Sequence, residues 1–430
     1  MLDRISGGEQ VKYLRSSIVA LFAMGLAIML ALAGCSSSAP APAATQAPAK
    51  AAEPTKAAAP APTTAAAAPT AAAAAKPAGS PVAVKIGLIA PLTGDVKTFG
   101  ESTRNGFELA VAEWNASGKL NISTVVADDK NDATEGVNAA TKEITQDKVN
   151  GIVGSVSSKV SIPISEVAQA NKVVQISPTS TNEKVTVDGG KRKDYVFRAC
   201  FIDPFQGLVM AKFVTNNLKL KTAAIMYDNA NDYVKGLATV FRDNFTKMGG
   251  QVTDFEAYAT NDTDFSAVLT KIASHNPDFL YIPDYYNKVN LIAAQAREKG
   301  VKAVLGGGDG WDSSDLDTKV TDGGYFSNHY SPESTAPEVQ NWVTKYKAKY
   351  GSVPDALATL GYDATNLLAN AVVTAGSNDP SKIRDALAAT KDFKAVSGNI
   401  TIDKDGNPVK SAVIIQIKGG KQTYVTTVAP

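Results

Sequence analysis

From residue 82 onward, the sequence alternates between short apolar runs and longer segments whose apolar side chains recur at helical spacing. The first apolar run, 82–90, ends at Pro91, and Phe107, Val111 and Trp114 then follow at intervals of three or four residues. Such repeated strand–helix units predict parallel sheets covered by helices on both faces, because each parallel connection has to cross the sheet. This is the pattern of an α/β protein, and about 350 residues are enough for two domains with cores of their own.

The same alternation predicts where the individual elements lie. Strands are predicted at 122–127, 151–154, 172–177, 222–227, 252–257, 279–283 and 301–305, and helices at 234–248, 265–274 and 289–299. After Tyr325 the rhythm changes to two long helices, 336–350 and 355–375, and a shorter one from Pro380. The chain then closes with a predicted hairpin of strands 398–402 and 412–417. The Asp-rich turn between them, 403–407, lacks the full pattern of a calcium loop.

The first 80 residues have a different composition. Basic residues precede an uncharged apolar stretch, 18–33, as in a secretory signal, although an uncleaved membrane anchor would share these features. Residues 32–35 (LAGC) resemble the lipobox of bacterial lipoproteins, in which the cysteine is acylated and becomes the first residue. The resemblance implies a signal peptide at 1–34 and lipid attachment at Cys35.

Residues 35–80 are predicted to form a disordered tether. They consist mainly of Ala, Pro and Thr and contain no large apolar side chain, so they have nothing to bury against the entropy of ordering. Frequent prolines interrupt any helix that the alanines would favour. Together with the lipid, the tether would hold the folded part at the outer, periplasmic face of the bacterial cytoplasmic membrane.

Composition argues against several classes of function. A net charge of +1 argues against a nucleic-acid-binding protein, which would carry a basic surface. One of the two cysteines is assigned to the lipid, so Cys200 is predicted to be a lone core residue without a disulfide. His275 and His329 are the only histidines, and GxSxG and HExxH motifs are absent. No metal or cofactor is therefore expected, and an enzyme is disfavoured.

Nine segments of the folded part together resemble one known family. They are 85–94 (KIGLIAPLTG), 99–100 (FG), 106–111 (GFELAV), 128–129 (DD), 154–158 (GSVSS), 176–181 (ISPTST), 227–228 (YD), 264–266 (DFS) and 361–364 (GYDA). In order and spacing they resemble the branched-chain amino-acid-type periplasmic binding proteins, the type I substrate-binding components of ABC importers. The resemblance covers the whole chain from residue 82.

This resemblance implies a type I periplasmic binding protein fold. Such a fold has two doubly wound, Rossmann-like α/β lobes, a hinge of three strands and a ligand cleft at the carboxyl ends of the sheet strands. It would place the first lobe at 82–201 plus 328–410 and the second lobe at 202–327 plus 411–430. The long helices after residue 336 would then return to the first lobe, which explains the change of rhythm.

The resemblance also assigns partners to the polar groups of an amino-acid ligand. Ser157 and Thr181 would bind its carboxylate, and Ser157 opens a predicted helix whose N-terminus favours anions. The backbone around Thr179 would accept from the ammonium group. The alternatives are that Ser157 is an ordinary helix cap and that both threonines are ordinary loop residues.

Asp309 is the predicted countercharge for the ammonium group. It lies in the segment 306–310 (GGGDG), directly after a predicted strand, and the glycines would let the backbone approach a ligand closely. An ordinary Gly/Asp turn is the alternative.

By the same resemblance, Phe99, Tyr233 and Tyr285 would form the walls of the cleft. Tyr286 competes with Tyr285 for this role, and Trp311 is a weaker candidate for covering the mouth. One departure from the family is that Asn131 and Val156 stand where enteric members often carry a disulfide. The side-chain preference of the site is therefore left open.

These features predict the extracytoplasmic, lipid-anchored substrate-binding component of an ABC importer. It would act as a monomer, capture a branched-chain or related small amino acid or amide by closure of the cleft, and deliver it to a membrane permease. No GxxxxGK[ST] segment is present, so the ATPase would be a separate chain. The alternative is a ligand-sensing module of the same fold that works with a separate signalling partner.

Overall fold

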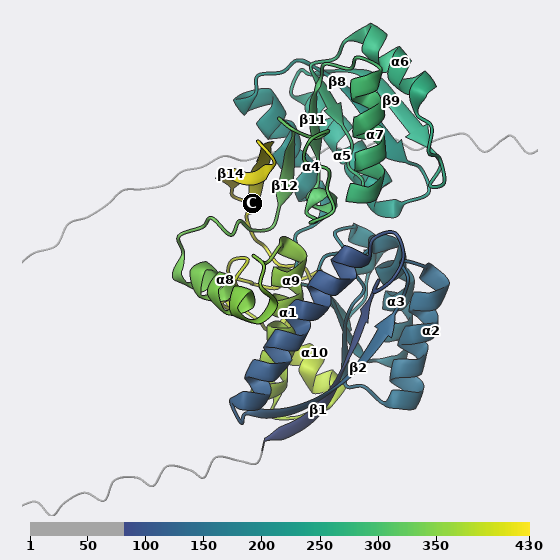
Figure 1. Cartoon of the computed structure of the whole chain (residues 1–430). Coiled ribbons are helices and arrows are strands. Elements are labelled where there is room, and N and C mark those ends of the chain that lie inside the picture. Colours follow the sequence, from purple (N-terminus) through teal and green to yellow (C-terminus); the bar gives the residue numbers. More distant parts are fainter. Residues whose placement is uncertain (1–80) are drawn as a thin grey trace, which may run out of the picture. The chain divides into compact units, whose positions relative to one another are not determined.

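The computed structural model describes residues 81–430, which belong to one compact unit built on two large sheets (Figure 1). The first sheet has five parallel strands in the order β2-β1-β3-β4-β7. Its strands are β1 (Val82–Ala90), β2 (Leu120–Asp128), β3 (Gly151–Gly154), β4 (Val174–Ser177) and β7 (Val196–Arg198). The prediction of an α/β protein with parallel sheets is confirmed.

Helices cover both faces of the first sheet. They are α1 (Lys97–Ala116), α2 (Ala133–Lys142), α3 (Ser158–Asn171), α8 (Pro337–Tyr350), α9 (Ala356–Ala375) and α10 (Pro380–Ala388). Helix α1 packs along α9 and helix α2 along α3, and Figure 1 shows these two pairs on opposite sides of the strands. Helix α9 is apolar almost all round because it lies between the sheet, α1 and α10. We call this sheet and its helices the first lobe.

The second sheet has seven strands in the order β14-β13-β12-β11-β10-β8-β9. They are β8 (Thr222–Asp228), β9 (Gln251–Tyr258), β10 (Phe279–Tyr281), β11 (Val304–Gly307), β12 (Tyr325–Asn328), β13 (Ala412–Lys418) and β14 (Lys421–Val428). The helices α4 (Asp203–Lys212), α5 (Asp232–Lys247), α6 (Ser266–His275) and α7 (Tyr286–Glu298) belong to this second lobe. The pairings β12–β13 and β13–β14 are antiparallel, and the other strand pairs of this sheet are parallel.

Short elements complete the described chain. Helices α2 and α4 each continue into a π-helical turn, at Glu143–Asp147 and Phe213–Asn217. Single 3-10 turns lie at Glu183–Val185 and Asp309–Trp311, and the strands β5 (Val187–Asp188) and β6 (Lys191–Arg192) form a small separate hairpin.

The chain passes between the two sheets three times, after β7, after β12 and before β13. The five strands of the first sheet are parallel to one another, and so are β8 to β12 of the second sheet. In each sheet, the carboxyl ends of these parallel strands therefore lie at one edge. In open α/β sheets this edge is where ligands bind. The residue limits of the lobes given above remain predictions.

The closing hairpin is predicted wrongly. Residues 398–402 form only isolated bridges, Phe393 with Ile400 and Ile402 with Pro408. The turn at 403–407 does form, because Oδ1 of Asp403 accepts hydrogen bonds from the backbone N–H groups two and four residues later. Strand β13 instead pairs with β12 and β14, which buries it in the second sheet.

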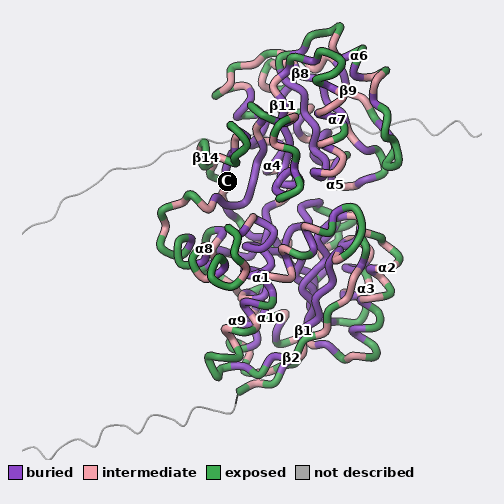
Figure 2. The backbone as a smooth tube through the Cα atoms, viewed as in Figure 1, coloured by how far each residue is buried: buried purple, intermediate pink, exposed green. Residues whose placement is uncertain are grey.

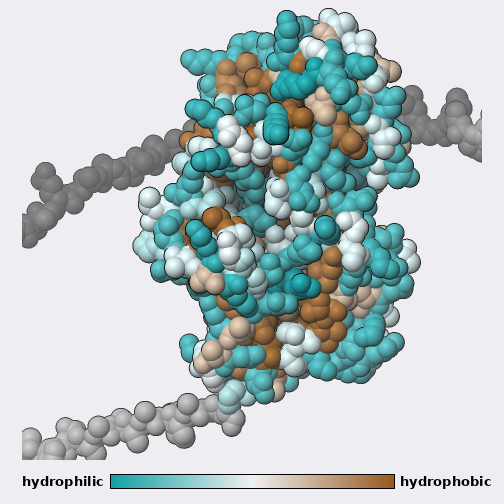
Figure 3. Space-filling view, viewed as in Figure 1, coloured by the Kyte–Doolittle hydropathy of each residue, from teal (hydrophilic) through white to brown (hydrophobic). Residues whose placement is uncertain are grey.

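The strands form the buried centre of each lobe, and exposed residues concentrate on the outer helix faces and loops (Figure 2). On the face shown in Figure 3, apolar side chains lie in separate patches among polar ones. Among residues 81–430, no helix has the length and apolar character that crossing a membrane requires. Cys200 is buried and forms no disulfide, in agreement with its prediction as a core residue. Cys35, the signal peptide and the tether lie outside the described residues.

Candidate functional site

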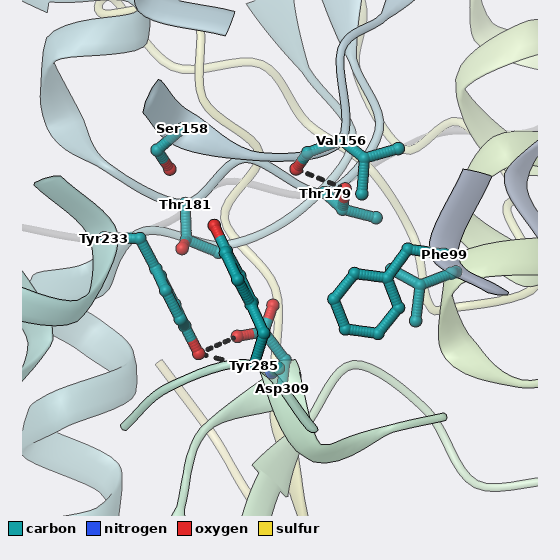
Figure 4. A pocket seen from close by; sticks show the side chains of 10 residues that line it. Phe99, Val156, Ser158, Thr179, Thr181, Tyr233, Tyr285 and Asp309 are labelled. Carbon is teal, nitrogen blue, oxygen red and sulfur yellow. Dashed lines mark hydrogen bonds between the residues drawn. The ribbon is translucent and has the colours of Figure 1, made fainter. Parts of the chain in front are cut away.

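A small cavity lies between the two lobes at the carboxyl ends of their strands (Figure 4). Its volume is only about 20 Å³, far below the range of about 300–1,000 Å³ that ligand pockets occupy, so the lining side chains nearly fill the space between the lobes. The first lobe contributes Phe99, Val156, Ser158, Thr179, Thr181 and Leu357, and the second lobe contributes Tyr233, Tyr285, Asp309 and Gly310. The site therefore forms only where both lobes meet.

The lobes are in contact beside this cavity. The hydroxyl oxygens of Thr98 and Ser313 are 2.9 Å apart, and the Tyr286 hydroxyl donates to the backbone oxygen of Asp95 at 3.1 Å. Both contacts join α1 or the loop before it to the second lobe. The structure thus shows the closed arrangement of the two lobes.

Six of the seven predicted ligand contacts line this cavity, and their roles in binding remain predictions. The exception is Ser157, whose hydroxyl donates to Oδ1 of Asn131 at 2.7 Å. The next residue, Ser158, lines the cavity instead and begins α3. Ser157 is the N-cap residue of α3 by position, but its side chain makes no capping hydrogen bond. The Ser157 side chain is thus directed at Asn131 rather than into the cavity.

The N-terminus of α3 and the loop after β4 form a wall of polar groups. Thr179 donates its hydroxyl hydrogen to the backbone oxygen of Val156 at 2.8 Å, as Figure 4 shows. The Thr181 hydroxyl is buried beside the Asp203 carboxyl, yet it makes no hydrogen bond of normal geometry within residues 81–430. Because the first N–H groups of a helix lack intrahelical partners, this wall is suited to an anionic group.

A fully buried arginine holds the loop after β4 in place. Arg198 donates from Nη1 to the backbone oxygen of Ser180 at 2.7 Å, and from Nη2 to Asn182 O and Thr186 Oγ1 at 3.0 Å. Burial lowers the pKa of its guanidinium, partly offset by the carboxyl of Asp203. Arg198 therefore fixes the conformation of the loop from the side away from the cavity.

Asp309 presents a buried carboxylate to the opposite wall. Its Oδ1 accepts from the Tyr233 hydroxyl at 2.9 Å and from the Gln206 amide at 2.8 Å, while Oδ2 lies 2.9 Å from Nε2 of His329. Only 7% of the residue is exposed. Three donors fix the plane of the carboxylate and stabilise its negative charge, and no Lys or Arg is among the described residues that line the cavity.

Two of the glycines before Asp309 make room for side chains of the second lobe. A Cβ at Gly306 would meet the ring of Phe279, and a Cβ at Gly307 would lie 2.0 Å from Nε1 of Trp311. Trp311 is fully buried and donates to the backbone oxygen of Ile282 at 2.9 Å. The prediction that Trp311 covers the cleft is therefore wrong, because its ring fills the space that Gly307 leaves in the second lobe.

Aromatic rings form the remaining wall. The rings of Tyr233 and Tyr285 stack with centroids 5.3 Å apart and an interplanar angle of 1°. Phe99 meets Tyr285 edge-on at 5.7 Å and Tyr286 at 5.1 Å. Of the two competing tyrosines, Tyr285 lines the cavity, whereas Tyr286 packs behind Phe99 and bonds the loop before α1.

Several residues of this site are not predicted from the sequence. Leu357 and Val156 add apolar surface to the cavity, and Gln206 and His329 hold Asp309 from outside it. The sequence carries no local signal for His329, because the strand that ends just before it, β12, is not among the predicted strands.

Comparison with known proteins agrees with this architecture. The family described as periplasmic binding protein matches residues 83–422. Leu/Ile/Val-binding protein homolog 2 of Brucella abortus (strain 2308) is 32% identical over 340 residues, which cover 77% of this chain and 89% of the relative. The match thus includes both lobes and the whole candidate site.

Several solved structures are also similar to this chain in sequence and in fold. The leucine-binding protein LivK of Thermotoga maritima MSB8 is 38% identical with a TM-score of 0.76, covering 81% of this chain and 99% of that protein. The substrate-binding protein LivJ of Streptococcus pneumoniae, solved in complex with isoleucine, is 32% identical with a TM-score of 0.75, covering 81% and 100%. A solute-binding protein of R. palustris in complex with benzoate is 25% identical with a TM-score of 0.74, covering 81% and 97%.

The predicted type I periplasmic binding protein fold is thus confirmed. These relatives are solute-binding proteins, and the family is extracytoplasmic. This chain belongs to the periplasmic binding protein family, and within it to the branched-chain amino-acid type of ABC-transporter substrate-binding proteins.

Proposed function

We propose that this protein captures a branched-chain or related small amino acid by closing its two lobes around it and then delivers it to a membrane permease. The observation that carries this proposal is the Asp309 carboxylate, which is buried, held by three donors and faced by no basic side chain among the described residues of the cavity. A buried negative charge of this kind is stable only with donors or a cation around it, and a ligand ammonium group supplies the cation.

The other walls suit the remaining parts of an amino acid. The N-terminus of α3 with Ser158 and the Thr181 hydroxyl would donate to the ligand carboxylate. Phe99, Val156 and Leu357 would contact an aliphatic side chain. The relatives named as leucine-binding or solved with isoleucine support this assignment.

Closure follows from the fact that the two halves of the ligand site lie on different lobes. A ligand that bridges Asp309 and the α3 N-terminus stabilises the closed form through contacts that the open form lacks. In the proposed transport cycle the closed protein docks on a permease, with the ATPase on separate chains. The lipid on Cys35 would keep it, as a monomer, at the membrane.

Aromatic acids are the alternative ligand class, because a similar structure holds benzoate. An aromatic acid has no ammonium group and would leave the Asp309 carboxylate facing an anion. Calorimetry on the full-length protein in detergent, with leucine, isoleucine, valine and benzoate, tests both classes. In a thermal-unfolding screen, a true ligand at about 100 times its Kd should stabilise the fold by about 2.7 kcal/mol.

The first prediction concerns Asp309 itself. Asp309→Ala should abolish leucine binding in calorimetry, since the ammonium group would be buried without a countercharge. Phe99→Leu serves as the control, because it alters the apolar wall and should weaken binding without abolishing it. Unchanged leucine affinity in Asp309→Ala, or binding of benzoate in place of all amino acids, would contradict the proposal.

Sensing with a separate signalling partner is the alternative role for the same ligand site. Uptake of radiolabelled leucine by the native organism, with and without this gene, distinguishes the two roles. Transport predicts a loss of high-affinity uptake that Asp309→Ala fails to restore. Uptake that is unaffected by deletion, with a protein that binds leucine normally, would favour sensing.

A further inference from the structure

His329 connects the Asp309 carboxylate to the segments that join the lobes. It follows directly after β12, and its Nε2 lies 2.9 Å from Oδ2 of Asp309. Its imidazole stacks on the ring of Phe201, with centroids 3.8 Å apart and planes inclined by 24°. Phe201 lies in the first connection between the sheets, and His329 lies in the second. The imidazole is thus fixed by one ring face and one nitrogen.

The surroundings of His329 determine which nitrogen carries the proton. An ionised carboxylate only accepts hydrogen bonds, so Nε2 must be the donor to Asp309. Nδ1 is buried and has no hydrogen-bond partner in the part of the chain that the structure describes. A second proton on Nδ1 would therefore be a buried donor without an acceptor, which is costly. The geometry favours the neutral imidazole protonated on Nε2.

The charged groups around His329 are consistent with a neutral ring. Burial lowers the pKa of His329, and the positive charge of Lys410 lowers it further, whereas the Asp309 carboxyl beside Nε2 and the more remote Asp312 raise it. Lys410 is itself buried, and it donates to the backbone oxygen of Ala199 in the first connection between the lobes. Burial thus has the largest effect and opposes protonation.

A neutral donor and a cationic donor at this position would have opposite effects on a ligand. Neutral N–H and O–H groups from His329, Gln206 and Tyr233 orient the Asp309 carboxylate and leave its full negative charge in place. An imidazolium would cancel that charge and repel a ligand ammonium group. The protonation state of His329 therefore decides whether the cavity presents a net negative charge.

We propose that His329 is a positioning residue that sets the charge selectivity of the cavity. As a neutral donor to Asp309, it makes the site prefer a zwitterionic amino acid over the same molecule without its ammonium group. This inference rests on the proposed function and names the residue that tunes it. The ligand class it selects is an aliphatic α-amino acid, and the class it excludes is the corresponding aliphatic acid.

The test compares leucine with 4-methylpentanoate, which is leucine with hydrogen in place of the amino group. The measured quantity is the Kd of 4-methylpentanoate divided by the Kd of leucine, and both values are obtained by calorimetry on full-length protein. In His329→Gln, whose amide donates without taking up a proton, the ratio should stay within about threefold of the wild-type value. In His329→Leu it should fall about tenfold, and in His329→Lys further still, because a cation then faces Asp309.

His275 provides a matched control on the same chain. Its Nδ1 lies 2.9 Å from Oδ1 of Asp254, so it forms the other histidine–aspartate pair of the described residues, at the surface of the second lobe. His275→Leu should leave the Kd ratio unchanged. The melting temperature of every variant reports separately on the fold.

If His329 had a purely structural role, His329→Leu would lower the melting temperature or change both Kd values together. The Kd ratio would then stay unaltered. That result would overturn the inference. A second readout is the leucine affinity of wild type and His329→Gln between about pH 5.5 and 8. The two profiles should run parallel, and a selective loss in wild type at low pH would show an imidazolium and contradict the neutral donor. Failure of the proposed function is distinct, because the wild type would then bind no amino acid, and this inference would fall with it.

Discussion

At the scale of single residues, Ser157 and Ser158 show how much one position matters at the start of a helix. Both are serines in the segment that follows β3, and the family resemblance favours the first. Successive side chains entering a helix point in directions about 100° apart, so only one of the two faces the cavity. The structure directs Ser158 there and holds Ser157 on Asn131.

The second prediction separates these two serines. Ser158→Ala should weaken leucine binding about tenfold, because a hydroxyl donor to the ligand carboxylate would be lost. Ser157→Ala should change the affinity by less than about threefold, since its hydroxyl is engaged with Asn131. Calorimetry on the two variants side by side measures both values. The reverse order would restore Ser157 as the ligand contact.

At the scale of elements, the loop after β4 owes its conformation to a residue on another strand. Arg198 ends β7 and bonds the backbone oxygens of Ser180 and Asn182, which flank the cavity residue Thr181. The loop thus reaches the cavity with its polar groups already placed. This preorganisation reduces the entropy that a ligand has to pay on binding.

The third prediction tests this support. Arg198→Met would remove the guanidinium donors from the buried Ser180 and Asn182 carbonyls, which would keep only the Cys200 thiol and the Val185 N–H, both weaker donors. The unfolding free energy should therefore fall by about 1–3 kcal/mol. Leucine affinity should fall about tenfold as well, because Thr179 and Thr181 lose their fixed positions. Urea unfolding and calorimetry measure the two effects.

Arg297→Met is the matched control for that variant. Arg297 also bonds two backbone oxygens, those of Val301 and Ala303, but at the far end of α7. The Arg297→Met variant should be less stable than wild type and keep the wild-type leucine affinity. If both variants lost affinity equally, the effect would come from lower stability and not from the loop.

Local patterns predicted most elements, and the exceptions depended on distant partners. The run 222–227 became β8 (Thr222–Asp228), because an apolar run bounded by polar residues needs no further information. The segment 398–402 does not form a strand, because strand pairing depends on which strand edge lies nearby in the fold. Strand β13, its predicted hairpin partner, pairs with β12 instead. Helix α4 was not predicted, since burial on several sides removes the polar stripe by which a helix is recognised.

Most of the candidate site was predictable through family resemblance, and its supports were not. The cavity residues Phe99, Thr179 and Asp309 lie next to motifs that the resemblance carries. Gln206 and His329 act through Asp309 from other elements, and no local pattern shows which side chains converge on one carboxylate.

At the scale of the whole molecule, closure brings two carboxyl groups of different lobes together at the N-terminus of α9. Asp312, after β11, accepts at Oδ2 from the backbone N–H of Ala356 and from the Asn328 amide, both at 2.8 Å. Asp355, the N-cap residue of α9, accepts from the backbone N–H of Ala358 at 2.8 Å. Burial and the nearby Asp312 raise the pKa of Asp355 to about 7, and burial raises the pKa of Asp312.

The fourth prediction is that closure takes up a proton. In an open form, with the lobes apart, the pKa of Asp355 would return toward its ordinary value near 3.8, so the closed form binds more protons between about pH 4 and 7. A form that binds more protons gains stability as pH falls, so leucine affinity should rise when pH is lowered from about 8 to 6. Calorimetry in buffers of different ionisation enthalpy should show proton uptake on binding near pH 7.

Asp355→Asn is the decisive variant for this linkage. Asparagine keeps the oxygen that caps α9 and cannot titrate, so the fold should persist while the proton uptake disappears. Its affinity at pH 8 should exceed that of wild type, because the repulsion between two carboxylates is gone. Proton uptake that persists unchanged in Asp355→Asn would assign the linkage to another group. Equal affinities for wild type at pH 6 and 8 would contradict the linkage. They would mean that Asp312 and Asp355 stay buried and close to each other in the open form as well.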